Sequence, residues 1–156
     1  MTVFSIDPGL ARVGWAIIES IGDRLKLLEC GLLQTPSDKS IQERLSLIHS
    51  GMMELTSHHK IDHIAIEELF FTKNVKTAID VAQARGVLMM LGHYLNVPVF
   101  EYTPKEVKTA VTSFGGADKY QVGQMVKMLL GLPEIPTPDD VSDACAIGIC
   151  HLFTVR

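Results

Sequence analysis

The first residue of the chain that suggests chemistry is Asp7, which ends the strand-like run Thr2–Ile6 and is followed directly by a Pro-Gly turn. The apolar run Val13–Ile18 after the turn predicts a β-hairpin. A carboxylate at the end of a central strand is costly unless it is paired, protonated or bound to a cation. Alternatively, Asp7 only accepts hydrogen bonds from turn amides, as aspartates before Pro-Gly often do. On this segment alone, the second interpretation is the simpler one.

A second apolar run also ends in acidic residues. Residues 62–69 (DHIAIEEL) are mostly apolar until Glu67 and Glu68, which predicts a buried strand with an acidic C-terminal end. Successive side chains of a strand point to opposite faces, so the two glutamates cannot both serve one site.

The last acidic pair is Asp140 and Asp143, three residues apart near the start of the last predicted helix. This spacing places both side chains on one face, and the positive end of the helix dipole favours anions there. Asp140 has a purely structural explanation, because with Thr137 as N-cap it would complete a capping box. Asp143 has none, and the small and apolar residues after it (ACAIG) indicate a helix packed closely against the sheet.

The four acids would lie together in one site if the strands ending at Asp7 and Glu67 are neighbours and the last helix crosses their ends. Two unit charges about 4 Å apart repel by roughly 4 kcal/mol at an effective dielectric constant of about 20, so four converging carboxylates need cations. The chain has no set of His and Cys at zinc-ligand spacing, which favours the hard ions Mg²⁺ or Mn²⁺. Two such ions about 3.5 to 4 Å apart suit phosphodiester hydrolysis. The sequence pattern leaves open whether the acids meet.

The rest of the pattern predicts the elements that must position these acids. Strand-like and helical segments follow one another in the order β-β-β-α-β-α-β-α-α-α. This order predicts an α/β fold with a mixed five-stranded sheet, three antiparallel strands first, flanked by helices. Capping boxes mark two helix starts, at Ser40 with Glu43 and at Thr103 with Glu106. The expected strands are residues 2–6, 13–18, 24–34, 62–69 and 97–102, and the expected helices begin near residues 40, 74, 103, 118 and 137.

Length and composition limit the class of protein. A chain of 156 residues with 47% hydrophobic content is long enough for one domain, residues 1–156, and too short for two ordinary ones. No stretch approaches the roughly 18 uninterrupted apolar residues of a membrane span and the N-terminus is not signal-like, so we expect a cytoplasmic protein with no membrane partner. The cysteines Cys30, Cys145 and Cys150 have apolar or small neighbours and are expected to be buried thiols.

The formal net charge of −4 has the wrong sign for a protein that binds nucleic acid through bulk charge. Two divalent ions would offset the four acids, and an anionic partner would then be met by local lysine patches. Scattered lysines are more often only a solvated face, which stays the alternative. The candidate lysines are Lys73 with Lys76, and Lys105, Lys108, Lys119 and Lys127.

Several motifs together resemble one known family. SIDPGLARVGWAI, AIEELFFTKN, QARGVL, VFEYTPKEVKTAVTSFGGADKYQV and DDVSDACAIGICH span nearly the whole chain in order. They are similar to the RuvC family of Holliday-junction resolvases, whose fold belongs to the RNase H-like superfamily. The resemblance implies a homodimer that nicks two opposed strands of a four-way DNA junction symmetrically during recombination and repair. It also implies two Mg²⁺ per active site, with Mn²⁺ as a substitute, and a branch-migration motor as a partner.

The resemblance assigns the metal-binding acids by motif. Glu67 is preferred to Glu68 because the acid of the family directly follows the AI dipeptide. Asp140 is preferred to Asp139 because only Asp140 has the three-residue spacing to Asp143. The metal-binding residues implied are Asp7, Glu67, Asp140 and Asp143.

The resemblance also implies residues that touch DNA. Lys108 and Lys119 match lysines that approach the scissile phosphate and are expected in catalysis. Phe70 matches an aromatic residue that stacks on a base, a contact worth roughly 1 to 3 kcal/mol, whereas Phe71 either stacks or packs. The expected DNA-binding residues are Phe70, Lys73, Lys76, Lys105, Lys108 and Lys119.

In the same family, protomers meet through the helix that contains QARG. That contact would explain the small and methionine-rich residues Ala82, Gly86, Met89 and Met90, but a face buried within one chain explains them equally well.

Three other functions fit parts of the sequence less well. A YqgF-type nuclease acting on ribosomal RNA precursors shares the DPG hairpin but fits AIEELFFTKN and the final acidic pair less well. An inactive junction-binding protein would leave Asp7 and Glu67 unexplained. An actin-like kinase needs two lobes, for which the chain is too short, and GGAD is a poor phosphate loop.

Overall fold

The computed structural model describes residues 1–68 and 75–155, and of Val75 only the backbone is described. The elements follow the predicted order. Most of the predicted bounds differ from the observed ones by one or two residues, although β2 is longer than expected at its C-terminal end. The elements are β1 (Thr2–Asp7), β2 (Arg12–Ile21), β3 (Arg24–Gln34), α1 (Ile41–Ser57), β4 (His63–Glu67), α2 (Val75–Leu95), β5 (Val99–Tyr102), α3 (Pro104–Thr112), α4 (Lys119–Leu130) and α5 (Asp139–Thr154).

The strands form one mixed sheet in the order β3-β2-β1-β4-β5. The first three strands are antiparallel, whereas β4 runs parallel to β1 and β5 runs parallel to β4. The predicted α/β fold with a mixed five-stranded sheet is therefore confirmed. Because β1 and β4 are parallel neighbours, Asp7 and Glu67 lie at the same end of the sheet.

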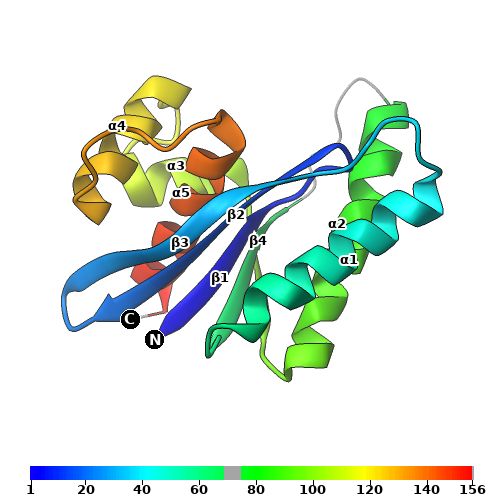
Figure 1. Ribbon diagram of the computed structural model, residues 1–156. Helices are drawn as coiled ribbons and strands as arrows, with labels where there is room; N and C mark the ends of the chain where they lie inside the picture. Colours follow the sequence, from blue (N-terminus) through cyan, green and yellow to red (C-terminus); the bar gives the residue numbers. More distant parts are fainter. Residues whose placement is uncertain (69–74, 156) are drawn as a thin grey trace.

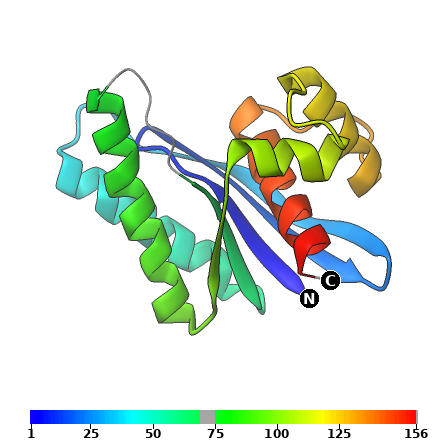
Figure 2. The same cartoon turned by 180° about the vertical axis from the view of Figure 1, so that it is seen from behind.

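Helices cover both faces of the sheet. Figure 1 and Figure 2 show α1 and α2 against one face and α3, α4 and α5 against the other. Successive side chains of a strand point to opposite faces of the sheet, so one strand contributes to the hydrophobic core on each face. In β1, Phe4 and Ile6 pack toward α1 and α2, and Val3 packs toward α5.

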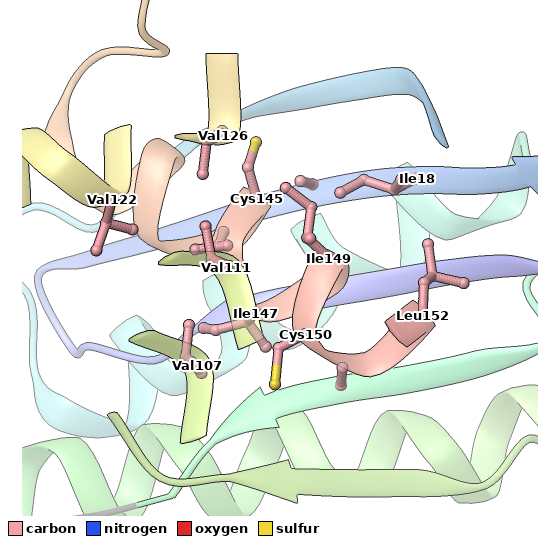
Figure 3. Close-up of a cluster of buried hydrophobic side chains, with 14 of the residues drawn as sticks. Ile18, Val107, Val111, Val122, Val126, Cys145, Ile147, Ile149, Cys150 and Leu152 are labelled. Carbon is pink, nitrogen blue, oxygen red and sulfur yellow. The ribbon is translucent and has the colours of Figure 1, made fainter. Parts of the chain in front are cut away.

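The helix α5 packs along β1 and β2 and forms the centre of its layer. A Cβ atom at Gly148 would lie 2.7 Å from Ser5 Oγ and 2.9 Å from Ile18 Cδ1, so glycine at this position lets the helix approach the sheet closely. Figure 3 shows the apolar residues around it, among them Ile18, Val107, Val111, Val122, Val126, Ile147, Ile149 and Leu152.

The helix starts confirm two predictions and correct one. Both predicted capping boxes are present, Ser40 with Glu43 and Thr103 with Glu106. The prediction of Thr137 as N-cap of the last helix is wrong, because the N-cap is Pro138, which has no side-chain donor or acceptor to offer. The N-cap lies one residue later than expected, and Asp140 is not used in a cap.

The structure can be compared with two further predictions, that the cysteines are buried thiols and that no segment spans a membrane. Cys145 and Cys150 are buried free thiols as predicted, and Cys30 is a free thiol that is only half-buried. Within residues 1–68 and 75–155, no helix is long and apolar enough to cross a membrane.

Candidate active site

Four acids from three elements lie near one another at one end of the sheet: Asp7, Glu67, Asp140 and Asp143. We call them the acid cluster. Asp7 is opposite Gly14 in the β1–β2 register, and the main chain of Asp140 lies directly over Gly14. A Cβ atom on residue 14 would overlap the carbonyl group of Asp140. The bare backbone of Gly14 therefore allows the start of α5 to lie against the end of β1.

The carboxylates of the acid cluster are largely buried, and their negative charges repel one another. Burial, and after it the carboxylates of Glu67, Asp143 and Asp140, raise the pKa of Asp7 to about 8. Burial and the nearby Asp143 raise the pKa of Glu67 to about 7, and burial also raises the pKa of Asp143. The described residues form no hydrogen bond to the Asp7 carboxylate. The interpretation of Asp7 as an acceptor for turn amides finds no support in these contacts.

Two cations partly compensate the acid cluster. Arg12 Nη2 lies 2.6 Å from Asp140 Oδ2. Lys119 Nζ lies 3.4 Å from Asp143 Oδ2 and also 3.4 Å from Asp139 Oδ2, and Asp143 is the main cause that raises the pKa of Lys119. Both lysine contacts are long and exposed, so each contributes little by itself.

The role of Arg12 was not predicted. Arg12 begins β2 beside the Pro-Gly turn. It is the single basic residue of the β1–β2 hairpin, and this was the signal that the sequence offered for its role. Its partner Asp140 is far away in the sequence, so the pair could not be recognised before the fold was known.

A pocket of about 310 Å³ opens next to the acid cluster. Glu67 and Asp143 line it together with Lys108 from α3 and Lys119 from α4. Both lysines act to lower the pKa of Glu67, which places their positive charge within range of this carboxylate. Lys119 and Asp143 also line a second pocket of about 270 Å³ on the other side. Two of the predicted catalytic acids, Glu67 and Asp143, thus line one pocket with both predicted lysines, whereas Asp7 and Asp140 are not among its lining residues.

The donor chemistry of the acid cluster fits a hard divalent cation, because every donor is a carboxylate oxygen. In the part of the chain that the structure describes, however, no three His, Cys, Asp or Glu side chains are grouped closely enough to hold a metal ion as they stand. Asp140 is paired with Arg12, and Asp143 is paired with Lys119. A metal ion bound by these two carboxylates would share them with the cationic side chains or replace those side chains.

The structure bears on the two choices between neighbouring acids, Glu67 or Glu68 and Asp140 or Asp139. Glu68 is exposed, and its main-chain N–H donates to the Tyr102 carbonyl oxygen over 2.8 Å, whereas Glu67 lies in the pocket. The Asp139 side chain is 75% exposed and the Asp140 side chain 27%. Asp140, and not Asp139, is among the carboxylates that raise the pKa of Asp7. The structure thus groups the preferred member of each pair with Asp7.

The predicted DNA-binding residues are more scattered. Lys105 is exposed on α3 beside Lys108, and Lys76 is exposed in the first turn of α2. Phe70, Phe71 and Lys73 lie outside the described residues. Lys127 is half-buried in the last turn of α4, away from the two pockets of the acid cluster.

The helix α2 divides the residues that were expected on one face. Met89 packs into the core under α1 and α2. A separate row is exposed, in which the Ile79 residue is 53% and the Met90 residue 49% accessible. A Cβ atom on Gly86 would meet nothing within 4 Å. We call the exposed residues Ile79, Ala82, Gly86 and Met90 the α2 stripe.

Comparisons with known proteins agree with the geometry. A family model described as crossover junction endodeoxyribonuclease RuvC matches residues 3–151. Proteins of that name from Halothermothrix orenii and Pelotomaculum thermopropionicum are 49% and 47% identical over 151 residues, which cover 97% of this chain and 92% of each relative. A solved structure of T. thermophilus RuvC in complex with a Holliday junction substrate has a TM-score of 0.92 at 31% identity, covering 100% of this chain and 96% of that one.

Proposed function

Because this chain belongs to the RuvC family of crossover junction endodeoxyribonucleases, with an RNase H-like fold, it resolves Holliday junctions, and we propose that the acid cluster is its catalytic site. The observation that carries the assignment is that carboxylates from adjacent strand ends and the start of α5 meet in a buried place, where burial and mutual repulsion raise the pKa of Asp7 to about 8 and that of Glu67 to about 7. Carboxylates arranged in this way repel one another unless a cation joins them. A site built for catalysis tolerates such a cost, whereas a helix cap or a turn does not need it.

The cations proposed are two Mg²⁺ ions per site, with Mn²⁺ as a substitute, held by the acid cluster. Mg²⁺ prefers oxygen ligands and usually keeps several of its waters, which suits a few carboxylates at the edge of a pocket. When bound, such ions polarise the scissile phosphate and lower the pKa of the attacking water.

Residues of the chain supply the remaining chemistry. Lys119 and Lys108 line the pocket beside Glu67, where positive charge would face a phosphate group that enters it. Fixed positive groups stabilise the negative charge that develops on the phosphate during hydrolysis. Arg12, which pairs with Asp140, is a third cation next to the same place.

The proposed DNA contacts extend the site outward. Lys76 and Lys105 are exposed and free to neutralise backbone phosphates, and Lys73 is included by its motif. Phe70 is proposed to stack on a base near the crossover. Affinity for the junction should then fall steeply as the salt concentration rises, because each phosphate contact releases counterions.

Symmetric nicking of two opposed strands requires two active sites, so the proposal includes a homodimer. The α2 stripe offers an exposed surface of small and apolar side chains, with open space around Gly86 in the described part of the chain. Small residues allow two helices to approach closely. A branch-migration motor as a further partner, and a cytoplasmic location, complete the proposal.

The experiment that tests the catalytic site uses a synthetic four-way DNA junction, a linear duplex and a structured RNA, each with Mg²⁺ or EDTA. The wild-type protein should make paired nicks in the junction only when Mg²⁺ is present. Asp7→Asn should abolish cutting and leave junction binding in EDTA nearly unchanged, because Asp7 holds metal and not DNA.

The matched control is Asp23→Asn, which removes the same charge from the exposed turn between β2 and β3. It should cut at the wild-type rate. Near wild-type cutting by Asp7→Asn would refute the assignment of the acid cluster, and preferential cutting of the RNA would refute the choice of substrate.

A further inference from the structure

Arg85, the arginine of the QARG sequence in α2, contacts the two strand ends beside the acid cluster. Its Nε donates a hydrogen bond of 3.1 Å to the main-chain carbonyl oxygen of Glu67. Its guanidinium group also forms an ion pair with Glu101 of β5. The Arg85 side chain is only 15% exposed and its bond to Glu67 is partly buried, whereas the Glu101 side chain is 42% exposed.

The direction of these contacts follows from strand alternation. In β4, Ile64 and Ile66 pack into the core under α1 and α2, and Glu67 points to the other face, into the pocket with Asp143. Glu101 is the register partner of Ile66 and therefore faces α2. Arg85 thus holds the backbone of β4 and a side chain of β5 from the face opposite to the carboxylate of Glu67.

The contact also lies where the strand pairing stops. Glu67 is the last residue of β4, and the N–H group of Glu68 makes one more bond, to the Tyr102 carbonyl oxygen. A strand end with few remaining partners can move, which would displace the carboxylate that it carries. The guanidinium group adds a charge-assisted bond at this position, and such bonds are stronger than bonds between neutral groups.

We propose that Arg85 is a positioning residue for the acid cluster: by holding the main chain of Glu67 and the side chain of Glu101 together, it fixes the Glu67 carboxylate toward Asp7 and Asp143. This inference rests on the proposed function, since it assumes that Glu67 binds metal. Arg85 does not touch DNA or metal and acts through the backbone of β4. Its place in the QARG motif, next to Gly86 of the α2 stripe, means that the same helix presents the stripe and holds the strand end.

The alternative role for Arg85 is simply to fasten α2 to the sheet. A fastening role would lower the melting temperature without a specific effect on metal affinity. Arg85→Gln removes both contacts. Arg85→Lys keeps the charge, but a single ammonium group lacks the fork of donors needed to hold both partners. Glu101→Gln weakens the ion pair and leaves the bond from Arg85 to Glu67.

Two measurements separate these roles without relying on cleavage. Isothermal titration of the purified protein with Mn²⁺ alone gives the metal affinity, and hydrogen exchange of the Glu68 amide reports on the end of β4. In Arg85→Gln we expect the Mn²⁺ dissociation constant to rise about tenfold, the usual scale for a group that orients a metal ligand. Exchange at Glu68 should also become faster. In junction cleavage kcat should fall and KM should stay unchanged, with Arg85→Lys intermediate.

The control is Arg24→Gln, which removes the same charge from the exposed start of β3 and should change none of these quantities. Wild-type Mn²⁺ affinity and Glu68 exchange in Arg85→Gln would overturn the proposal. If that variant does not fold, the same result in Arg85→Lys would overturn it. The titration of Glu67→Gln separates this outcome from a failure of the proposed function, because wild-type Mn²⁺ affinity in that variant would show that Glu67 is not a metal ligand at all.

Discussion

Asp7→Asn should make the metal-free protein more stable at pH 8, although it removes a residue of the proposed catalytic site. The pKa of Asp7 is raised from its ordinary value of 3.8 to about 8, so between these pH values the folded state keeps a proton that the unfolded state has released. Stability therefore falls as the pH rises through this range. Asparagine has no charge, and the cost of burying one disappears with the substitution.

The expected size follows from the pKa values. A tenfold change in proton affinity corresponds to about 1.4 kcal/mol, so the complete effect at Asp7 is about 5 kcal/mol of unfolding free energy at pH 8. Glu67 and Asp143 share the same repulsion, so the protons belong to the group and not to one residue. We therefore expect Asp7→Asn to gain about 2 kcal/mol at pH 8 and less than about 0.5 kcal/mol at pH 4.

The assay is urea denaturation followed by circular dichroism in EDTA, at intervals from pH 4 to pH 8. Asp23→Asn serves as the control and should follow the wild-type curve. Addition of Mg²⁺ should reduce the advantage of Asp7→Asn, because a bound cation stabilises only the folded wild-type protein. An Asp7→Asn variant that is no more stable than wild type at pH 8 would show that the acid cluster is not strained.

Three further predictions concern the scaffold. Gly14→Ala pushes a methyl group into the main chain of Asp140 and should destabilise the protein by about 3 kcal/mol in thermal unfolding, whereas Gly86→Ala, with open space around it, should be neutral or slightly stabilising. Burial lowers the pKa of His151 to about 4, so the folded state resists a proton that the unfolded state takes up, and the stability that His151 contributes is lost as the pH is lowered from 6.5 to 4. The free energy of unfolding of His151→Phe relative to wild type should therefore rise over this range, and a constant difference between the two curves would contradict this. Thr103→Ala removes the capping box of α3 and should cost about 1 kcal/mol, a loss of about 3 °C in melting temperature, with unchanged cutting at 25 °C.

Local signals in the sequence were sufficient to predict the elements. Ser40 with Glu43 and Thr103 with Glu106 mark helix starts by contacts within four residues, and the structure has both. Asp7 stands out for a similar reason, since a charge that ends an apolar strand needs an explanation. The error at Thr137 arose because the residue types of a capping box were present, while the backbone places Pro138 at that position.

Contacts between residues of different helices and strands could not be predicted in the same way. The pairing of Arg12 with Asp140, the approach of Asp140 to Gly14 and the contact of Arg85 with Glu67 each join residues that are far apart in the chain. Such contacts depend on strand order and register, which hydrophobic periodicity does not specify. The same limit explains why Met89 and Met90 were expected on one face of α2, although Met89 packs into the core and Met90 is exposed.

The acid cluster joins residue 7 of the first strand to residue 143 of the last helix, and this has a consequence during protein synthesis. A nascent chain on the ribosome can form its N-terminal hairpin early, but its acid cluster is incomplete until residue 143 has emerged and α5 has docked beside β1. On the proposed assignment, a translation product that ends before residue 143 does not cut DNA. Contacts over so long a sequence separation also slow the folding of a domain that depends on them.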